Sequence, residues 1–207
     1  GPKIKKPKHI FFIVGESIPQ WSLDETHKLL NICPGLWDFK SQPHTVQIPN
    51  FLPAGNVSRP SIVSLMSGIY DAGLEINERE SFWKGVFPTS FAHQMKRLGY
   101  QTIYWYGGNA SYGNFNHFGK AQGFDRVESA SIFCGPDAPK TWVGVYDHVF
   151  LENIEQQIKS INEPTFHFIY TTSNHGPYKM EDSLLDYDPE KVMPDVGEDL
   201  RSNKTRN

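Results

Sequence analysis

Three short apolar runs separated by helix-like segments constrain the fold of this chain most strongly. The runs are "HIFFIVGES" from His9, "QTIYWYGG" from Gln101 and "TFHFIYTT" from Thr165, and each stops at glycine or hydroxyl-bearing residues. Short apolar runs rich in β-branched and aromatic residues are typical of strands covered on both faces. We therefore expect an α/β fold, a three-layer sandwich with a mostly parallel central sheet, whose ligands bind beyond the carboxyl ends of the strands.

Helical patterns fill the intervals between these runs. "RPSIVSLMSG" has Pro60 near its first turn and Gly68 as its stop, and "TSFAHQMKRLGY" is amphipathic and closed by Gly99. A third helix is expected around "DHVFLENIEQQIKSI". The remaining predictions are a short extended piece at "HTVQIPNF", a glycine- and asparagine-rich loop at "GGNASYGNFNHFG" and a small turn at "GFDRV".

Length and charge limit the functions to consider. The 207 residues suit one substantial α/β domain, and the formal net charge of -3 argues against a general nucleic-acid surface. Any phosphate-bearing ligand must therefore be met locally. Cys33 and Cys134 have no metal-type spacing, so two free thiols and one disulfide both remain open.

Residues 1–8 are expected to be a tag remnant, Gly1-Pro2, followed by a basic linker. Such a basic stretch is typical of a solvated linker, and it also suits a juxtamembrane segment that follows a membrane anchor. The apolar run that comes next is far too short to span a bilayer.

Two polar residues stand where a strand end and a helix start would place them. Glu16 directly follows the first apolar run, so it is a candidate metal ligand or a solvated carboxylate. Ser58 lies near the start of the first helix, where serine either bonds exposed amides or acts as a nucleophile favoured by the helix dipole and a bound cation. Its neighbour Arg59 is either a phosphoryl contact or a surface arginine.

Other polar residues lie in the predicted loops. His175 in "TTSNHGPY" could hold a phosphoryl oxygen or protonate a leaving group, or be an exposed loop histidine. Asn109, Tyr112, Asn114 and Asn116 could bond a polyol or phosphate, although such loops are often only turns. Asp147 opens a helix-patterned segment, so we interpret it as helix-start polarity and not as a metal ligand.

A set of ordered motifs carries a family resemblance that spans roughly His9 to Tyr178. The motifs are, in order, "FFIVGES", "GNVSRPSIVSLMSGIY", "YGGNASYGNFNHFG", "GFDRV", "WVGVYDHVFLENI" and "TTSNHGPY". Together they resemble the sulfatase-like phosphotransferases of the alkaline phosphatase superfamily, and most of all the lipoteichoic acid synthases and phosphoglycerol transferases.

The resemblance implies roles for individual residues. Glu16 would bind a divalent metal, and Ser58, at a position where the family usually has threonine, would be both the nucleophile and a metal ligand. His175 would contact the phosphoryl group. The other implied substrate contacts are Asn109, Asn114 and Asn116, whereas the family's aromatic and arginine positions are not matched cleanly in this chain.

The implied reaction is transfer of a phosphoglycerol or related head group from a phospholipid to a hydroxyl of a glycan or polyol acceptor, through a phospho-serine. Manganese is the expected metal, with magnesium and zinc as alternatives. By the same resemblance, the full-length protein would be anchored at the extracytoplasmic face of a bacterial cell membrane by a segment absent from this chain.

One departure from the family pattern concerns the metal site. Family members complete it with an adjacent aspartate and histidine after a further strand, and this chain reaches Asn207 without such a strand. We therefore expect residues 9–207 to be the N-terminal portion of a catalytic domain, incomplete at its C-terminus, with little activity of its own.

Three alternatives to this function remain open. A true sulfatase would use a Cys-or-Ser-x-Pro-Ser-Arg motif, which Ser58, Pro60 and Ser61 match but Ile62 breaks. Phosphoethanolamine transfer is a related reaction. A non-catalytic domain that binds an anionic glycan or lipid belongs to a different functional class.

Overall fold

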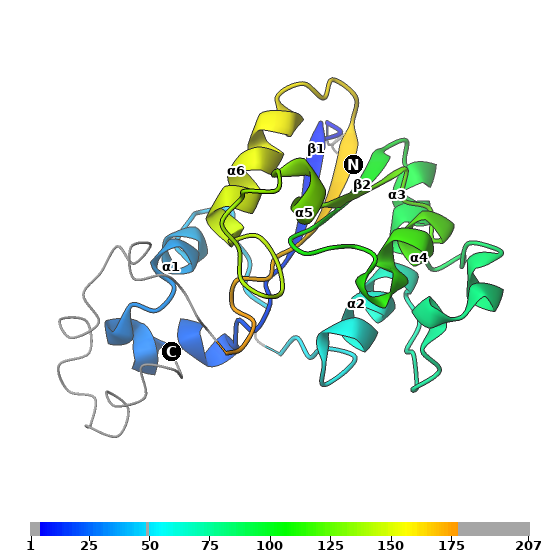
Figure 1. Ribbon diagram of the computed structural model, residues 1–207. Coiled ribbons are helices and arrows are strands. Elements are labelled where there is room, and N and C mark those ends of the chain that lie inside the picture. Colours follow the sequence, from blue (N-terminus) through cyan, green and yellow to red (C-terminus); the bar gives the residue numbers. More distant parts are fainter. Residues whose placement is uncertain (1–4, 49, 178–207) are drawn as a thin grey trace. The chain divides into compact units, whose positions relative to one another are not determined.

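The computed structural model describes residues 5–48 and 50–177 of the chain (Figure 1). They form two compact units. The larger unit contains Gly1–Glu16 and Pro53–Ser173, and the smaller contains Ser17–Leu52 together with the segment that begins at Asn174.

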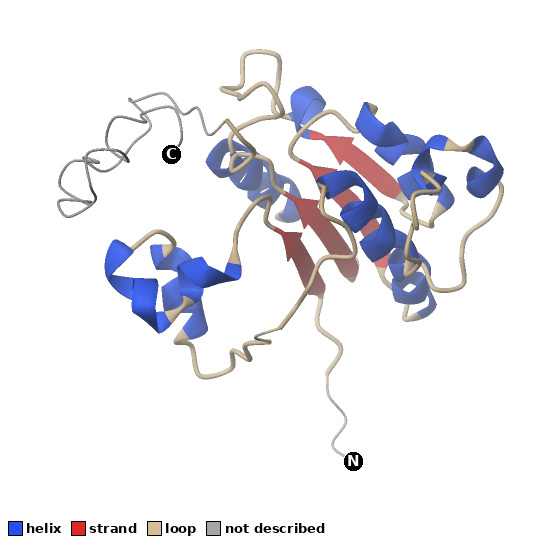
Figure 2. Ribbon diagram, turned by 90° about the horizontal axis from the view of Figure 1, so that it is seen from below, coloured by secondary structure: helices blue, strands red, loops and turns tan. Residues whose placement is uncertain are grey.

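A four-stranded sheet in the order β1-β4-β2-β3 forms the centre of the larger unit (Figure 2). All three strand pairs are parallel, which confirms the predicted sheet. The register pairs Val14 with Tyr170 and Tyr170 with Tyr106, so the three strands end level with one another. The strands are β1 His9–Val14, β2 Gln101–Tyr106, β3 Arg126–Ser129 and β4 Thr165–Tyr170.

Helices pack against both faces of this sheet, as expected for a three-layer sandwich. One hydrophobic cluster joins a sheet face to α2, α3 and α4, and a second joins the opposite face to α5 and α6. The two clusters arise because successive side chains of a strand point to opposite faces. The helices are α2 Ser58–Ser67, α3 Phe91–Arg97, α4 Phe115–Ala121, α5 Ala130–Phe133 and α6 Asp147–Ile158.

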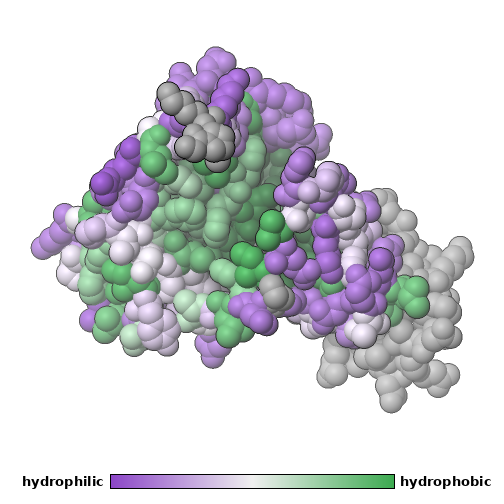
Figure 3. All heavy atoms as spheres, turned by 180° about the vertical axis from the view of Figure 1, so that it is seen from behind, coloured by the Kyte–Doolittle hydropathy of each residue, from purple (hydrophilic) through white to green (hydrophobic). Residues whose placement is uncertain are grey.

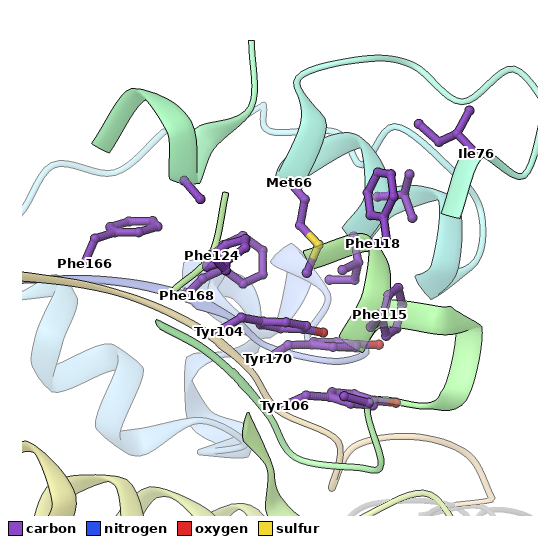
Figure 4. Packing of buried hydrophobic residues seen from close by; sticks show 14 of the residues in the cluster. Met66, Ile76, Tyr104, Tyr106, Phe115, Phe118, Phe124, Phe166, Phe168 and Tyr170 are labelled. Carbon is purple, nitrogen blue, oxygen red and sulfur yellow. The ribbon is translucent and has the colours of Figure 1, made fainter. Parts of the chain in front are cut away.

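Aromatic rings dominate the first cluster. Tyr104, Tyr106 and Tyr170 lie nearly parallel in Figure 4, with their hydroxyl groups pointing the same way. The rings of Tyr106 and Tyr170 stack with centroids 5.2 Å apart and an interplanar angle of 10°. Phe115 from α4 meets the ring of Tyr106 edge-on at 5.6 Å. The carboxyl ends of β2 and β4 are therefore held in a rigid aromatic layer.

The prediction that the first apolar run is covered on both faces is wrong. Among residues 5–48 and 50–177, no strand pairs with the outer side of β1, and Phe11 and Ile13 are 49% and 60% exposed. Apolar side chains, drawn green, reach the surface of the larger unit in Figure 3. Composition alone could not reveal this, because an apolar edge strand and a central one have the same local pattern.

The three predicted helices are confirmed, but several other segments differ from expectation. The predicted turn "GFDRV" leads into strand β3, and the second half of the predicted loop at 107–119 forms α4. The described residues of "HTVQIPNF" form no strand.

The smaller unit contains three helices that the sequence pattern did not indicate. They are η1 Gln20–Leu23 and η2 Glu25–Leu30, both of the 3-10 type, and α1 Pro34–Lys40. Cys33, at the start of α1, and Cys134, at the end of α5, are both free thiols. Within residues 5–48 and 50–177, no helix has the length and apolar character needed to cross a membrane.

Candidate active site

Glu16 and Ser58 lie together beyond the carboxyl ends of the strands. The Ser58 hydroxyl donates a hydrogen bond of 2.9 Å to Oε2 of Glu16, although the two residues are 42 positions apart. Glu16 follows the end of β1 by two residues, and its amide nitrogen lies 3.3 Å from Oγ1 of Thr171, just after β4. The structure thus joins the two residues that the sequence analysis proposed as metal ligand and nucleophile.

Ser58 is the first residue of α2, but its hydroxyl does not cap the helix. The N-cap residue is Val57, in an extended conformation, and no side-chain cap bond is present. The structure therefore does not support the interpretation of Ser58 as a capping residue, because its hydroxyl bonds Glu16. The N-terminus of the ten-residue helix remains the positive end of its dipole, beside the Ser58 oxygen.

The loop before α2 is fastened to the first turn of the helix. Oγ of Ser61 lies 2.9 Å from the carbonyl oxygen of Gly55 and 3.0 Å from that of Val57, so both oxygens are within reach of its single proton. A Cβ atom on Gly55 would lie 2.7 Å from Cγ of Pro60, so the loop packs closely against the helix. These contacts hold the backbone at Ser58 in one position.

Tyr170 is a third member of the site that the sequence analysis did not identify. Its hydroxyl donates a hydrogen bond to Oε2 of Glu16, the same oxygen that accepts from Ser58. Burial, and next the bond to Glu16, raise the pKa of Tyr170 well above its ordinary value, so the hydroxyl stays protonated. One carboxylate oxygen thus receives two hydroxyl donors.

Arg59, the residue after Ser58, takes part in a separate cluster with Glu78. Its Nη1 lies 3.0 Å from Oε1 of Glu78, and Nδ2 of Asn114 donates to the other oxygen of the same carboxylate. The guanidinium group lies 5.5 Å from the ring centroid of Tyr112, and a hydrogen bond with Tyr112 is the main cause that raises the Arg59 pKa. Arg59 and Asn114 therefore share Glu78 as a partner.

The other predicted substrate contacts have local partners. Oδ1 of Asn109 accepts from the amide and the hydroxyl of Ser111, at 3.0 and 2.8 Å, in an Asx-turn. Oδ1 of Asn116 accepts from the amide of His117 at 2.8 Å. His175 belongs to the smaller unit, and its Nδ1 donates to the carbonyl oxygen of Gly176 at 2.8 Å. These roles in substrate binding stay predictions.

Asp147 ties the start of α6 to the segment after β4. Its Oδ1 accepts from the amides of Thr172 and Ser173, at 2.9 and 3.0 Å, and its own amide donates to Oγ of Ser173 at 2.7 Å. This reciprocal arrangement agrees with the interpretation of Asp147 as a helix-start residue. It also anchors the chain just before Asn174 and His175.

The donor atoms at the site suit a hard cation. Glu16 supplies a carboxylate and Ser58 a hydroxyl, which are the oxygen ligands that manganese and magnesium prefer. Among the described residues, no group of three or more His, Cys, Asp or Glu side chains could hold a metal ion. The Glu16 carboxylate and the Ser58 hydroxyl therefore suit a divalent cation as two ligands of a larger set.

Two residues of this region were missed in the sequence analysis, Tyr170 and Glu78. Tyr170 is the last residue of an apolar run, and its position at a strand end was the only available signal. Glu78 lies in the short 3-10 helix η3 Ile76–Glu78, which no sequence pattern linked to Ser58 or Arg59.

The parallel sheet between two helical layers, with a serine and a glutamate at the strand ends, defines an alkaline phosphatase-like fold. A protein of the alkaline phosphatase superfamily from Vibrio parahaemolyticus matches with a TM-score of 0.71 and 23% identity over 91% of this chain. The lipoteichoic acid synthase LtaP from Listeria monocytogenes matches with a TM-score of 0.55 and 19% identity over 69% of this chain.

The chain belongs to the Sulfatase family, whose family model matches residues 8–202. It spans 46% of the Vibrio protein and 35% of LtaP, which is less than half of each. At these identities the two structures establish the fold of this chain. Its family is one of enzymes, and their members generally use divalent metals.

Proposed function

We propose that this chain forms part of a metal-dependent transferase that moves a phosphoglycerol, or a related phospho-alcohol, from a phospholipid to an acceptor hydroxyl. The observation that carries the proposal is the hydrogen bond of 2.9 Å that the hydroxyl of Ser58, the first residue of α2, donates to Glu16. The similarity to LtaP, a lipoteichoic acid synthase, supports a phospholipid head group as the transferred unit.

Ser58 is suited to act as the nucleophile. Its proton is directed at Oε2 of Glu16, so the lone pairs of Oγ face away from the carboxylate. The N-terminus of α2 favours an anion close to this oxygen, because helix N-terminal amides and the helix dipole stabilise negative charge. A phosphodiester would therefore be stabilised next to the attacking oxygen.

The proposed reaction is a double displacement. Oγ of Ser58 loses its proton and bonds to phosphorus, the bond from phosphorus to the diacylglycerol oxygen breaks, and that oxygen takes up a proton. An acceptor hydroxyl of a glycan or polyol then loses its proton and bonds to phosphorus, the bond from phosphorus to Ser58 breaks, and Oγ of Ser58 takes up a proton again. The net change is exchange of one phosphoester alcohol for another.

Glu16 and Ser58 would hold the divalent cation, for which manganese is the first choice and magnesium or zinc the alternatives. When bound, such a cation lowers the pKa of a serine hydroxyl and polarises phosphoryl oxygens. Glu16 keeps Ser58 oriented through its hydrogen bond. His175 and Arg59 are proposed to contact the phosphoryl group. Asn109, Asn114 and Asn116 are proposed to line the head-group pocket.

A phospholipid donor implies that the enzyme works at a membrane surface. We place the full-length protein at the extracytoplasmic face of a bacterial membrane, since the named function of LtaP supports that setting. Nucleic acid is not among the proposed partners, because the net charge of -3 offers no general basic surface.

Sulfate-ester hydrolysis is a second candidate function. It is favoured by membership of the Sulfatase family and by the match of Ser58, Pro60 and Ser61 to the nucleophile motif of sulfatases. Ile62 stands where that motif has an arginine, and its side chain is only 1% exposed, in the core. We therefore rank phosphoryl transfer first.

The test measures release of fluorescent diacylglycerol from a labelled phosphatidylglycerol by the full-length protein with Mn²⁺. We expect Ser58→Ala and Glu16→Gln each to lower turnover by at least about 10³-fold, because the first removes the proposed nucleophile and the second a proposed metal ligand. Ser64→Ala is the matched control, since Ser64 lies on the same helix with a buried hydroxyl that has no hydrogen-bond partner among the described residues.

Other outcomes would point to the alternatives. Turnover of an aryl sulfate but not of the lipid would favour the sulfatase. Release of a phosphoethanolamine head group in preference to phosphoglycerol would change the donor but keep the mechanism. Binding of the lipid without turnover by the parent protein would indicate a binding domain, and full activity of Ser58→Ala would remove Ser58 as the nucleophile.

A further inference from the structure

We propose that Tyr170 is a positioning residue, whose hydroxyl holds the Glu16 carboxylate in the orientation that serves both Ser58 and a divalent cation. This inference rests on the proposed function of the site. It assigns a role to Tyr170, which lies at the end of a buried strand and is not itself a proposed ligand of the cation.

The position of Tyr170 is more tightly defined than that of Glu16. Tyr170 ends β4, which pairs with β1 on one side and β2 on the other, and it is 4% exposed. Its ring stacks on Tyr106 at 5.2 Å (Figure 4). Packing of this kind leaves the phenol ring one rotamer, so its hydroxyl occupies a fixed point.

Glu16 lies beyond the end of β1, where ladder hydrogen bonds no longer hold the backbone. Two groups from the end of β4 contact it. Oγ1 of Thr171 accepts from the Glu16 amide at 3.3 Å, and the Tyr170 hydroxyl donates to the carboxylate. The first contact fixes the backbone, and the second limits rotation of the side chain.

Ser58 and Tyr170 donate to the same atom, Oε2 of Glu16. Loss of the Ser58 proton during attack would remove one of these two bonds. The Tyr170 bond does not depend on that proton, so it continues to orient the carboxylate. Loss of a hydrogen bond that orients a metal ligand commonly changes metal affinity by about 10- to 100-fold.

The experiment titrates Mn²⁺ into the full-length protein by calorimetry. For Tyr170→Phe, which keeps the ring and removes the hydroxyl, we expect Mn²⁺ to bind about 10- to 100-fold more weakly than to the parent. Tyr106→Phe is the matched control, because Tyr106 is the stacking partner of Tyr170 but donates no hydrogen bond to Glu16 within the described residues. It should bind Mn²⁺ as the parent does.

Kinetic readouts separate positioning from a general loss of structure. If Tyr170 positions Glu16, then Tyr170→Phe requires more Mn²⁺ for half-maximal activity, while KM for the lipid donor stays within about twofold of the parent value. Circular dichroism spectra of the parent and all variants, recorded at the same low temperature, check that Tyr170→Phe is folded. The paramagnetic resonance spectrum of bound Mn²⁺ should also differ from that of the parent.

The outcomes distinguish this inference from the proposed function. Equal Mn²⁺ affinity of folded Tyr170→Phe and the parent overturns the positioning role and leaves the proposed reaction intact. If Tyr170→Phe binds Mn²⁺ more weakly than the parent and the parent itself releases no head group, the positioning role is supported and the proposed reaction is contradicted. A parent that binds none of Mn²⁺, Mg²⁺ and Zn²⁺ contradicts both.

Discussion

Three tyrosines lie in one aromatic layer, but their hydroxyl groups have different surroundings. The hydroxyl of Tyr104 is fully buried and has no hydrogen-bond partner among the described residues, whereas that of Tyr170 bonds Glu16. Burial raises the pKa of Tyr104 well above its ordinary value, so the group is a neutral, unpaired donor. A buried polar group without a partner costs about 1–3 kcal/mol.

We expect Tyr104→Phe to raise the free energy of unfolding by about 1 kcal/mol, because it removes the unpaired hydroxyl and keeps the ring. Urea unfolding measures the change. The control is Tyr100→Phe, since the Tyr100 hydroxyl donates to the carbonyl oxygen of Pro7 at 3.0 Å. That variant should lose about 1 kcal/mol. A loss of stability in both variants would show that the Tyr104 hydroxyl is satisfied in solution.

Helix α2 is fixed at both ends, and this fixes Ser58. At its end Gly68 has φ 69°, in the left-handed region, and a Cβ atom there would lie 2.8 Å from the carbonyl oxygen of Thr89. The Thr89 hydroxyl also donates to the carbonyl oxygen of Ser67 at 2.6 Å. The C-terminus of α2 therefore packs directly on the segment that leads to α3.

We expect Gly68→Ala to lower the free energy of unfolding by about 2–3 kcal/mol, from the left-handed conformation and the contact with Thr89 together. The control is Gly73→Ala, because Gly73 has φ 77° but a Cβ atom there would meet no atom of the described residues within 4 Å. It should lose only about 1 kcal/mol. Chemical denaturation measures both, and equal losses would show that the Thr89 contact relaxes without cost.

A buried chain of hydrogen bonds links β1, β4 and β2 across the larger unit. His167 is fully buried, and Nε1 of Trp105 donates to its Nδ1 at 3.1 Å. The ring proton of His167 therefore lies on Nε2, which donates to Nδ1 of His9 at 3.1 Å. Burial, and then the charges of His9 and Arg126, lower the pKa of His167 to about 4. Protonation would break this chain of bonds.

The unfolded chain has a histidine pKa of about 6.5, so between roughly pH 6.5 and 4 it binds a proton that the folded protein does not. The stability that His167 contributes is complete above pH 6.5 and is lost as the pH falls toward 4, by up to about 3 kcal/mol. Urea unfolding at several pH values checks this prediction. His167→Gln should flatten the dependence, while the exposed His44→Gln should leave it unchanged. An unaltered profile in His167→Gln would assign the acid sensitivity to other groups.

At the candidate site, the sequence indicated the candidate residues Glu16 and Ser58 but not their surroundings. Glu16 and Ser58 were predictable because polar residues that follow a strand end or begin a helix are brought to the same edge of a parallel sheet. The partners of Arg59 and Asn114 were not predictable. Both side chains bond Glu78, and that choice depends on how η3 packs against α4.

Local sequence patterns are sufficient to predict the class of fold and the positions of β1, β2, β4, α2, α3 and α6. Those elements are encoded by local apolar periodicity and by glycine and proline at their ends, which act over a few residues. The position of β1 at the edge of the described sheet and the hydrogen bond from Tyr170 to Glu16 follow from the three-dimensional packing instead. Strand order and register set these contacts between residues more than 150 positions apart, and no local pattern specifies them.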